Sequence, residues 1–580
     1  MKKDEQGYAL VMVLFLILIL TILGTAVMGA AINGAQQTET RESDVQGLHL
    51  AEKSLEGALA SITAELSGKV NNDQKALDTA IQAYLQSIKP EDFLVSTELE
   101  AADGKITDIS YIREEGSSQY AKYVLTIKAE AKVNGVVRKL EQEVIIDTFP
   151  DFLKYALGTE GDLILNGAPS ITGNLYAGDQ FWVSDTANYI YNSPRTTRSK
   201  FPELKGEAHI QSLSNLLYSE NESAYQKVDA SGDAVQIADR IQRVLGIGMD
   251  KVKIKNQREF VEINVRDSFV DKVMEAIGGG LGREQVESSL QGGSLGTHLS
   301  ERYPSIFTTL VPEQLVKPTP PPEPFDDSEE EQERYDREME EYNEKMDAYQ
   351  ISIKQLTQPE SSMVYNGNLN LDGLELSGIE YPEDKKKDDS PAWLIVDGDL
   401  TIDSLGTAAI PVRANILVTG NVLIRGEANF DATIFSLGLK GREPETGYST
   451  VLQDASIGGL NGKELVMISQ GAILINRVEA FQSTPTVLRA FFYTDEDAEL
   501  YGVGSTVSIY GGFFAKETLT INAVVGGVTS GESQLNFNPL DNQSKPRFQV
   551  EYNPDIFENQ KIGLPRVNQI NVHSGKLKME

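Results

Sequence analysis

Residues 7–32 read GYALVMVLFLILILTILGTAVMGAAI, and this stretch decides how the chain begins to fold. No charged side chain occurs between Glu5 and Glu39. A helix of about 20 apolar residues crosses the roughly 30 Å hydrocarbon core of a bilayer, so this run is long enough to span one. A secretory signal peptide is the first alternative, but its apolar region is usually only about 7–15 residues long. The sequence therefore predicts one membrane-spanning helix over residues 8–33.

The charges that flank this segment predict its orientation. Lys2 and Lys3 precede the apolar run. Positive charge next to a spanning helix favours the cytoplasmic side. We therefore expect a single-pass protein of the cell membrane, with a cytoplasmic N-terminus and an extracytoplasmic C-terminal part.

Length, charge and cysteine content limit the class of protein. A chain of 580 residues has room for three or four domains. Its formal net charge of −34 argues against nucleic acid and anionic membrane surfaces as the main partners of the ectodomain. The sequence has no cysteine, so disulfides and thiolate metal sites are excluded.

Residues 34–150 predict a helix followed by a small antiparallel sheet. A second helix is expected over about Gln74–Ile88, and strands over 93–99, 106–112, 120–133 and 136–146. Asn134-Gly135 separates the last two strands and is a strong hairpin signal. The first helix is predicted from an apolar face that repeats every three or four residues, formed by Val45, Leu48, Leu55, Leu59, Ile62 and Leu66.

The start of the chain resembles a type IV prepilin. A short charged leader ends at Gly7, an aromatic residue follows, and residues 48–59 read LHLAEKSLEGAL. This combination is similar to the N-terminal domain of PilX-type minor pilins. The resemblance implies cleavage of the Gly7–Tyr8 bond by a prepilin peptidase, removal of leader residues 1–7 and N-methylation of Tyr8. It also implies other pilins and the pilus assembly machinery as partners.

One residue departs from the family pattern. Most pilins carry glutamate at the fifth mature position, where this chain has Met12. In the family, its absence is associated with minor or tip-type subunits, and it leaves processing itself open. A plain signal anchor without processing is the alternative. The residues expected to pack against neighbouring pilin helices in the membrane are Leu10, Met12, Leu14, Ile17, Thr21 and Gly24.

A repeated phrase predicts a parallel β-helix (a solenoid) in the rest of the chain. Glycine or a polar residue opens each copy, and apolar residues alternate behind it. Gly398 and Gly420 are 22 residues apart, a plausible length for one coil. First coils are expected over 151–184 and the main solenoid over 358–528, with a β-sandwich as the alternative. The copies are residues 161–165, 367–371, 398–402, 420–424, 471–475 and 517–521.

An insertion is expected to interrupt the solenoid. Residues 185–316 predict an α+β segment, with helices at 234–245 and 267–277 and strands at 251–255 and 260–265. Residues 529–580 are expected to form a cap and a tail. Residues 317–357 predict a proline-rich spacer and an acidic helix. This helix has a heptad seam formed by Tyr335, Met339, Tyr342, Met346, Tyr349, Ile353 and Leu356. The seam is expected either to pack on its own chain or to dock another subunit.

Signals for catalysis, metals and cofactors are weak. His49, His209, His298 and His573 stand singly, without a ligand at metal-site spacing, so neither a metal nor a cofactor is expected. Many parallel β-helices act on polysaccharides, which needs two carboxylates across a groove. Asp397, Asp399 and Asp403 are the best cluster, with Arg413 and Arg425 nearby. Aspartate is expected beside a corner glycine for backbone reasons alone, so we do not expect an enzyme.

Taken together, the sequence predicts an α+β protein with a pilin-type membrane helix, a small antiparallel sheet and a solenoid head. The function that follows is a minor pilin-like structural or assembly component of a type IV pilus or related envelope filament, at its tip or base. A membrane-anchored adhesin that binds glycan is the first alternative, and a polysaccharide-active enzyme is the second.

Overall fold

The computed structural model contains two compact units, which we describe separately. Unit 1 comprises residues 1–148 and 568–580, and unit 2 comprises residues 149–567. The structure describes residues 5–67, 69, 74–95, 102–113, 122–230, 232–255, 263–278, 282–325, 328–382, 391–439, 447–476, 487–538, 544–560, 562–565, 567 and 569–579.

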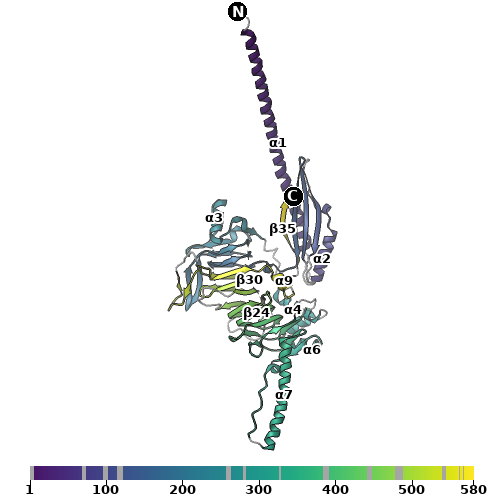
Figure 1. The fold of residues 1–580 in the computed structure, drawn as a ribbon, viewed down its shortest axis with the longest axis vertical. Helices are drawn as coiled ribbons and strands as arrows, with labels where there is room; N and C mark the ends of the chain where they lie inside the picture. The colour runs from purple at the N-terminus through teal and green to yellow at the C-terminus, as the bar shows by residue number, and fades with distance from the viewer. Residues whose placement is uncertain are drawn as a thin grey trace. The chain divides into compact units, whose positions relative to one another are not determined.

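Unit 1 is organised around one long helix, α1 (Glu5–Ser67) (Figure 1). Its first half is apolar and exposed, and its second half packs on a sheet. The helix α2 (Gln74–Ser87) adds Leu77, Ile81 and Leu85 to the same core. The α1 residues buried in this core keep a three-to-four spacing: Ala51, Leu55, Ala58, Ile62 and Leu66. Of the predicted face, Leu48 and Leu59 are only partly buried, and Val45 is 53% exposed because it precedes the part of α1 that packs on the core.

An antiparallel meander forms the sheet of unit 1. Its strands are β1 (Leu94–Val95), β2 (Ala102–Arg113), β3 (Lys122–Val133) and β4 (Val136–Asp147). The β3–β4 turn is the predicted one, because Asn134 and Gly135 both adopt positive φ angles, of 48° and 85°. Residues 96–99 and 120–121 of the predicted strands lie outside the described residues.

A fifth strand corrects the prediction of a loose C-terminal tail. Strand β35 (Asn571–Met579) pairs antiparallel with β4 and forms an edge of the sheet. The preceding Ile570 is buried in the core of unit 1. The sequence of β35 hid this strand, because Gly575 interrupts it and its exposed half alternates lysine with Leu577 and Met579 instead of forming an apolar run. Unit 2 is therefore inserted between two neighbouring strands of unit 1.

Unit 2 is built from parallel ladders, which rules out the antiparallel β-sandwich. The first ladder contains the apolar strands that neighbour the repeated phrases in the sequence. Its central strands are mostly buried on both sides, whereas its end strands β16 (Val252–Ile254) and β17 (Thr308–Leu310) are partly exposed. In spatial order the strands of this ladder are β17, β18 (Met363–Tyr365), β21 (Trp393–Val396), β23 (Ile410–Val418), β24 (Val422–Ser436), β26 (Leu465–Ser469), β28 (Val487–Thr494), β30 (Val507–Ala515), β5 (Leu157–Thr159), β8 (Leu175–Ala177), β13 (Ala208–Ile210) and β16.

A second set of parallel pairings contains the repeated phrases themselves. One run is β19 (Leu369–Leu371), β22 (Leu400–Asp403), the start of β24, β25 (Thr450–Gly459) and β27 (Ile473–Asn476). The other run is β29 (Ala498–Gly502), β31 (Leu519–Ala523), β6 (Leu163–Gly167), β9 (Phe181–Ser184) and β14 (Leu216–Ser219), with β15 (Gln226–Lys227) antiparallel at its edge.

A third set joins the remaining strands. The strand β20 (Ile379–Glu380) pairs with β23, which pairs with β24. The second run of this set contains, in spatial order, β30, β34 (Phe548–Tyr552), β7 (Ser170–Thr172) and β12 (Glu203–Lys205). Residues 529–567 are therefore more than the predicted cap, because β34 lies between two strands of the ladder.

The order of the strands shows an unexpected chain path. The chain enters the first ladder in its middle, at β5, and leaves one end after β16. It re-enters at the opposite end, at β17, and returns to β30, which pairs with β5. The prediction that residues 185–316 leave the ladders is wrong for β12, β13, β14, β16 and β17. Their short strands and interspersed helices concealed the repeat.

Helices cover the ladders between these two passages. They are α3 (Ala234–Leu245), α4 (Val265–Ile277), α5 (Arg283–Gln291) and α6 (Leu295–Arg302), and α3 and α4 lie close to the predicted bounds. Residues 260–262 of a predicted strand lie outside the described residues. Lys272 of α4 is fully buried, with its Nζ 5.6 Å from the Trp393 ring centroid and donating to the Ile562 carbonyl at 2.8 Å.

The other elements of unit 2 lie outside the ladders. They are the hairpin β10 (Thr186–Tyr191) and β11 (Ser193–Arg198), the pair β32 (Val528–Thr529) and β33 (Asn536–Phe537), α7 (Glu329–Thr357) and α9 (Ile556–Gln560). Short 3₁₀ turns include η2 (Asp151–Lys154) and η6 (Pro312–Leu315).

Candidate functional site: membrane helix, arm and pocket

The first half of α1 has the properties of a membrane segment. An 18-residue window reaches a mean hydropathy of 3.0, with none of its residues buried. Gly7 and Tyr8 lie in the first turns of this helix. The proposed packing residues lie on its exposed surface, with Leu10, Met12, Leu14 and Ile17 between 54% and 73% exposed.

Polar groups within this half are satisfied by the helix itself. The Thr21 hydroxyl donates to the Ile17 carbonyl at 2.7 Å, so it presents no unpaired donor to lipid. A side chain added at Gly24 would meet no atom within 4 Å. Because the side chains at Thr21 and Gly24 are small, another helix can approach this surface closely. Small residues allow such close packing between membrane helices.

The helix joins this apolar segment to the core of unit 1 without a break. Its second half buries five side chains against the sheet. Arg138 of β4 pairs with Asp44 of α1, and this hydrogen bond lowers the pKa of the Asp44 carboxyl. The apolar half and the sheet of unit 1 are thus joined by a single continuous helix.

The predicted heptad helix is α7, and it forms an arm that extends beyond the strands of unit 2 (Figure 1). At its base Leu356 is fully buried in the main core and Ile353 packs against it. The other five seam residues, from Tyr335 to Tyr349, are half-buried. Another segment therefore covers the seam along most of its length.

The proline-rich segment provides that cover. Leu315 of η6 and Ile353 both pack against the core at the base of α7, while Ser328 directly precedes its first residue. The helix α7 is about 43 Å long at 1.5 Å per residue. The described residues 316–325 span about 31 Å as polyproline II, so this extended segment can lie along most of α7 (Figure 1).

Burial along the segment agrees with that path. Leu315, Pro318, Pro321 and Pro324 are half-buried, whereas most residues between them are exposed. Polyproline II has three residues per turn, so these four side chains share one face. The seam is thus covered within the same chain, by a segment that sequence reasoning regarded only as a spacer.

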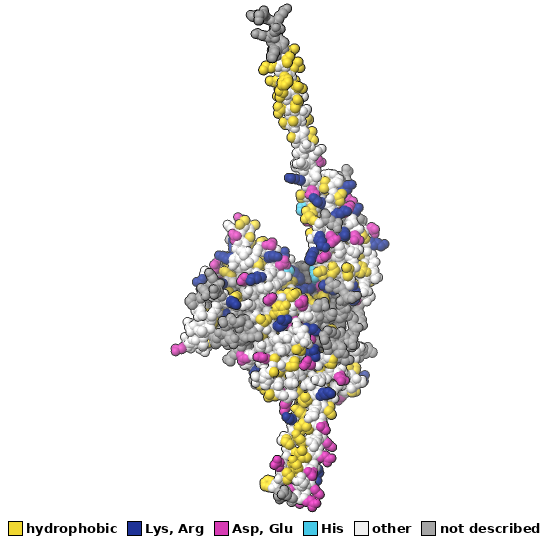
Figure 2. Space-filling model, in the orientation of Figure 1, with side chains coloured by type: hydrophobic (Ala, Val, Ile, Leu, Met, Phe, Trp, Pro, Cys, Tyr) yellow, Lys and Arg dark blue, Asp and Glu magenta, His cyan; other side chains and the backbone are white. Residues whose placement is uncertain are grey.

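Phe325 lies where the proline-rich segment meets the tip of the arm. Its side chain is 98% exposed, more than any other large apolar side chain among the described residues. Glu323, Glu329 and Glu330 are exposed on either side of it. The arm as a whole is acidic, and Figure 2 shows magenta carboxylates along it. The tip is thus one apolar side chain surrounded by negative charge.

A pocket of about 590 Å³ lies beside the β10–β11 hairpin. Its lining combines aromatic and aliphatic side chains with amides and one guanidinium: Asn188, Tyr189, Ile190, Pro194, Arg195, Thr196, Tyr501 and Gln534. The volume falls within the range of roughly 300–1,000 Å³ that is usual for ligand sites. Burial and a hydrogen bond to Glu499 raise the pKa of Tyr501, so this residue stays neutral.

The strand β11 is basic in an otherwise acidic chain. Arg195 and Arg198 lie on it, and Lys200 follows. Arg195 donates to the Ser533 carbonyl at 3.3 Å, and Arg198 donates to the Asn221 side chain. These partners are neutral, so the positive charge of the strand is not neutralised by these contacts.

The carboxylates considered for catalysis bind backbone groups. Asp399 accepts from the Asn421 N–H at 2.8 Å, and Asp403 accepts from the Leu405 N–H at 3.0 Å. Asp397 accepts from the Gly296 N–H at 2.8 Å and from the Thr419 hydroxyl. Arg413 binds Glu380 and the Tyr381 carbonyl, and Arg425 binds Gln453. These contacts fit the backbone role of corner aspartates.

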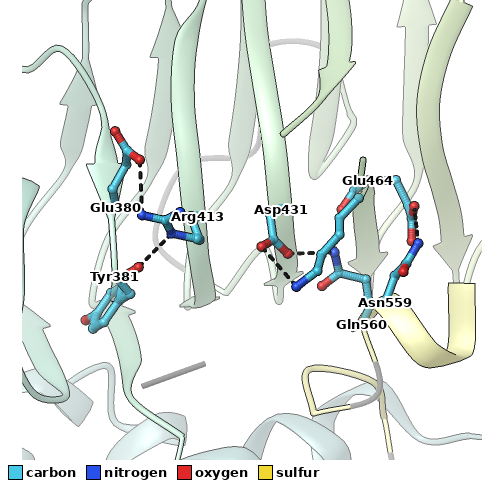
Figure 3. Close-up of polar contacts among 8 residues, drawn as sticks. Glu380, Tyr381, Arg413, Asp431, Glu464, Asn559 and Gln560 are labelled. Atoms are coloured by element: carbon cyan, nitrogen blue, oxygen red, sulfur yellow. Dashed lines mark hydrogen bonds and ion pairs between the residues drawn. The ribbon is translucent and has the colours of Figure 1, made fainter. Parts of the chain in front are cut away.

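A buried polar cluster was not anticipated from the sequence (Figure 3). Glu464 is fully buried and accepts from Asn553 and Asn559, each at 3.0 Å. Gln560 of α9 donates to Asp431 at 3.1 Å and to the Glu464 carbonyl at 2.8 Å. Burial raises the pKa of the Glu464 carboxyl. The amide donors all come from residues 553–560, so the cluster holds the C-terminal segment on the ladder.

Three of the histidine side chains lie beside single carboxylates. Within the described residues, no group of three His, Asp or Glu side chains is arranged to hold a metal ion. His49 lies beside Glu52, His209 beside Glu207 and His573 beside Asp147. Burial lowers the pKa of His209, so this ring stays neutral in the core.

Comparisons with known proteins do not assign this chain to a family. No family model matches the chain, and no curated protein matches it. Among solved structures, the chain is similar to the competence-associated pilin ComZ from Thermus thermophilus, with 12% sequence identity over 93% of this chain and 98% of that chain. The TM-score is 0.24, which is too low to support an argument about fold or function.

Proposed function

We propose that this protein is a membrane-anchored, pilin-like structural or assembly component of an envelope filament. The observation that carries the proposal is the continuity of α1, whose exposed apolar half leads directly into the helix that packs on the antiparallel sheet of unit 1. A signal peptide or a simple tether does not need a continuous helix between the membrane segment and the folded domain. A filament subunit needs one, because lateral packing of its apolar helix must fix the position of the folded domain outside the membrane.

The proposal includes processing and placement. A prepilin peptidase cleaves between Gly7 and Tyr8, and the surface formed by Leu10, Met12, Leu14, Ile17, Thr21 and Gly24 packs against other pilins. The N-terminus starts in the cytoplasm, residues 8–33 of unit 1 span the membrane, and the rest of unit 1 and all of unit 2 lie outside. Unit 2, residues 149–567, would crowd a repeating lattice, and Met12 replaces the usual glutamate. Both features favour the tip or base of a filament over its repeating shaft.

We infer further that the parallel ladders of unit 2 together form a β-helix. Three sets of pairings support this, since β23 belongs to the first and third sets and β24 belongs to all three. Asn166 and Asn522 stack in register on neighbouring strands, as residues at equivalent positions of successive coils do. In this architecture unit 2 is a stiff head, which suits a terminal subunit.

Mass spectrometry of the N-terminus tests the proposal. The protein purified from its own membranes is expected to begin at N-methylated Tyr8. A Gly7→Ala variant provides the control, because it should retain Met1 or the leader while leaving both units folded. An intact Met1 in the unaltered chain would make the protein a static signal-anchored one. A terminus near Ala30 would make it a secreted one. Either result rejects the pilin-like role.

A further inference from the structure

We propose that the arm of one copy of this chain inserts Phe325 into the pocket beside the β10–β11 hairpin of a second copy. This inference does not depend on prepilin processing or on the identity of other pilins. It follows from two complementary surfaces of unit 2, one apolar and acidic and the other partly apolar and basic.

The arm tip has the features of a knob. Phe325 is 98% exposed and takes no part in the contact between the proline-rich segment and the α7 seam. Large apolar side chains at interfaces act as anchors when they enter a pocket on the partner. Glu323, Glu329 and Glu330 provide negative charge around this anchor.

The pocket has the features of the matching socket. Ile190, Pro194, Tyr189 and Tyr501 give it apolar surface, and its 590 Å³ is ample for one aromatic side chain. Arg195 lies in its wall, and Arg198 follows on the same strand. Because the whole chain carries a net charge of −34, two acidic copies would otherwise repel each other. A basic strand is therefore the favourable place for a second acidic copy to dock.

The geometry of the arm allows Phe325 to reach this pocket only on another molecule. Ser352 and Leu356 fix the base of α7 in unit 2, and the helix is continuous to Glu329. Its rise of about 1.5 Å per residue keeps the tip roughly 35 Å from that base. A rigid arm cannot fold back on its own head. Because knob and socket differ, the contact is heterologous, with one copy contributing its arm and the other its pocket.

Intermolecular cross-linking tests the contact directly, since the chain has no cysteine. The full-length protein in detergent is prepared as two single variants with tags of different size, Glu323→Cys and Gln534→Cys. Glu323 is exposed beside Phe325, and Gln534 is exposed in the pocket lining. The mixture is treated with a short bismaleimide, and the mixed dimer is measured on a gel. Val235→Cys, 68% exposed on α3, replaces Gln534→Cys as the matched control.

We expect the mixed dimer to form at least tenfold faster with Gln534→Cys than with Val235→Cys. Adding Phe325→Ala to the Glu323→Cys chain should reduce it to the control rate, and Arg195→Glu in the other chain should reduce it severalfold. Equal rates for Gln534→Cys and Val235→Cys would overturn the proposal. A fast cross-link that survives Phe325→Ala would overturn it too. Circular dichroism checks that each variant is folded, which is expected because the side chains of Glu323, Phe325, Gln534 and Val235 are all exposed.

Discussion

Asn166 and Asn522 are 356 positions apart in the chain, yet the Nδ2 of Asn166 donates to the Oδ1 of Asn522 across 3.1 Å. They face each other on the paired strands β6 and β31. This is where the passage that ends at residue 254 joins the passage that begins at residue 308. The Asn522 Oδ1 also accepts from the Asn188 N–H at 3.1 Å, and its Nδ2 donates to Glu499 at 2.9 Å. One side chain thus connects three segments at the junction.

Replacing Asn522 with alanine should destabilise this junction. Asn522 is fully buried, so the change leaves the Asn166 amide and the Asn188 N–H without their acceptor. A buried polar group that loses its partner costs about 1–3 kcal/mol, so we expect unit 2 to lose about 2–4 kcal/mol of its unfolding free energy. Urea unfolding of the full-length protein in detergent measures the loss. The matched control is Asn188→Ala, whose side chain is exposed and whose backbone contact is kept; an equal loss in both variants would contradict the assignment.

Asp495 should make the stability of unit 2 depend on pH. Burial raises the pKa of its carboxyl to about 6, although Tyr493 donates to it at 3.0 Å and the Val265 N–H at the start of α4 also binds it. The folded state therefore prefers the protonated form. The contribution of this carboxyl to the unfolding free energy is fully present below about pH 4, which is its pKa in the unfolded chain. This contribution is lost as the pH rises through about 6, which is its pKa in the folded protein.

The Asp495→Asn variant isolates this contribution, because asparagine keeps an acceptor for both donors and has no charge. Relative to the variant, the unaltered chain should lose up to about 3 kcal/mol of unfolding free energy between pH 4 and pH 7, at 1.36 kcal/mol per pKa unit. Urea unfolding at several pH values measures the difference. The exposed Asp497→Asn serves as the control. A difference between Asp495→Asn and the unaltered chain that does not change with pH would show that Asp495 titrates normally.

Local pattern predicted most of unit 1 and the type of strand in unit 2. The three-to-four spacing of α1, the Asn134-Gly135 turn and the alternation of β3 are each set by neighbouring residues, and they appear where expected. The repeated phrases correctly indicated parallel strands, because glycine and aspartate at corners and alternating apolar residues reflect local backbone geometry.

Long-range order could not be predicted in the same way. Nothing near β35 indicates that it pairs with a strand more than 400 residues earlier, and nothing near β5 indicates that β30 lies beside it. The burial of Glu464 could not be predicted, because its partners come from residues 553–560. The α7 seam was recognised, but not its cover, since a proline-rich segment carries no apolar periodicity of the helical kind.

Pro321 should support the folded arm more than its neighbour Pro322. Pro321 is half-buried on the face that covers the α7 seam, whereas Pro322 is exposed. Alanine at either position removes the fixed φ of proline to the same extent, but only Pro321→Ala also removes packing against the seam. Hydrogen exchange of the α7 amides around Tyr342 measures the effect. We expect about tenfold faster exchange in Pro321→Ala than in Pro322→Ala; equal rates would mean that the segment does not lie on α7.

Removing residues 571–580 should selectively loosen the sheet of unit 1. Strand β35 pairs with β4 along most of its length, and its loss turns β4 into an unprotected edge. Lys578 pairs with Glu141 and lowers the pKa of that carboxyl, but this contact is exposed and contributes little. Hydrogen exchange of the full chain should therefore show β4 amides exchanging at least tenfold faster after truncation, and nearly unchanged in Lys578→Glu. Since unit 2 lies between β4 and β35 in the sequence, its ladders should keep their protection. Unchanged β4 exchange in the truncated chain would mean that the C-terminal strand does not pair there.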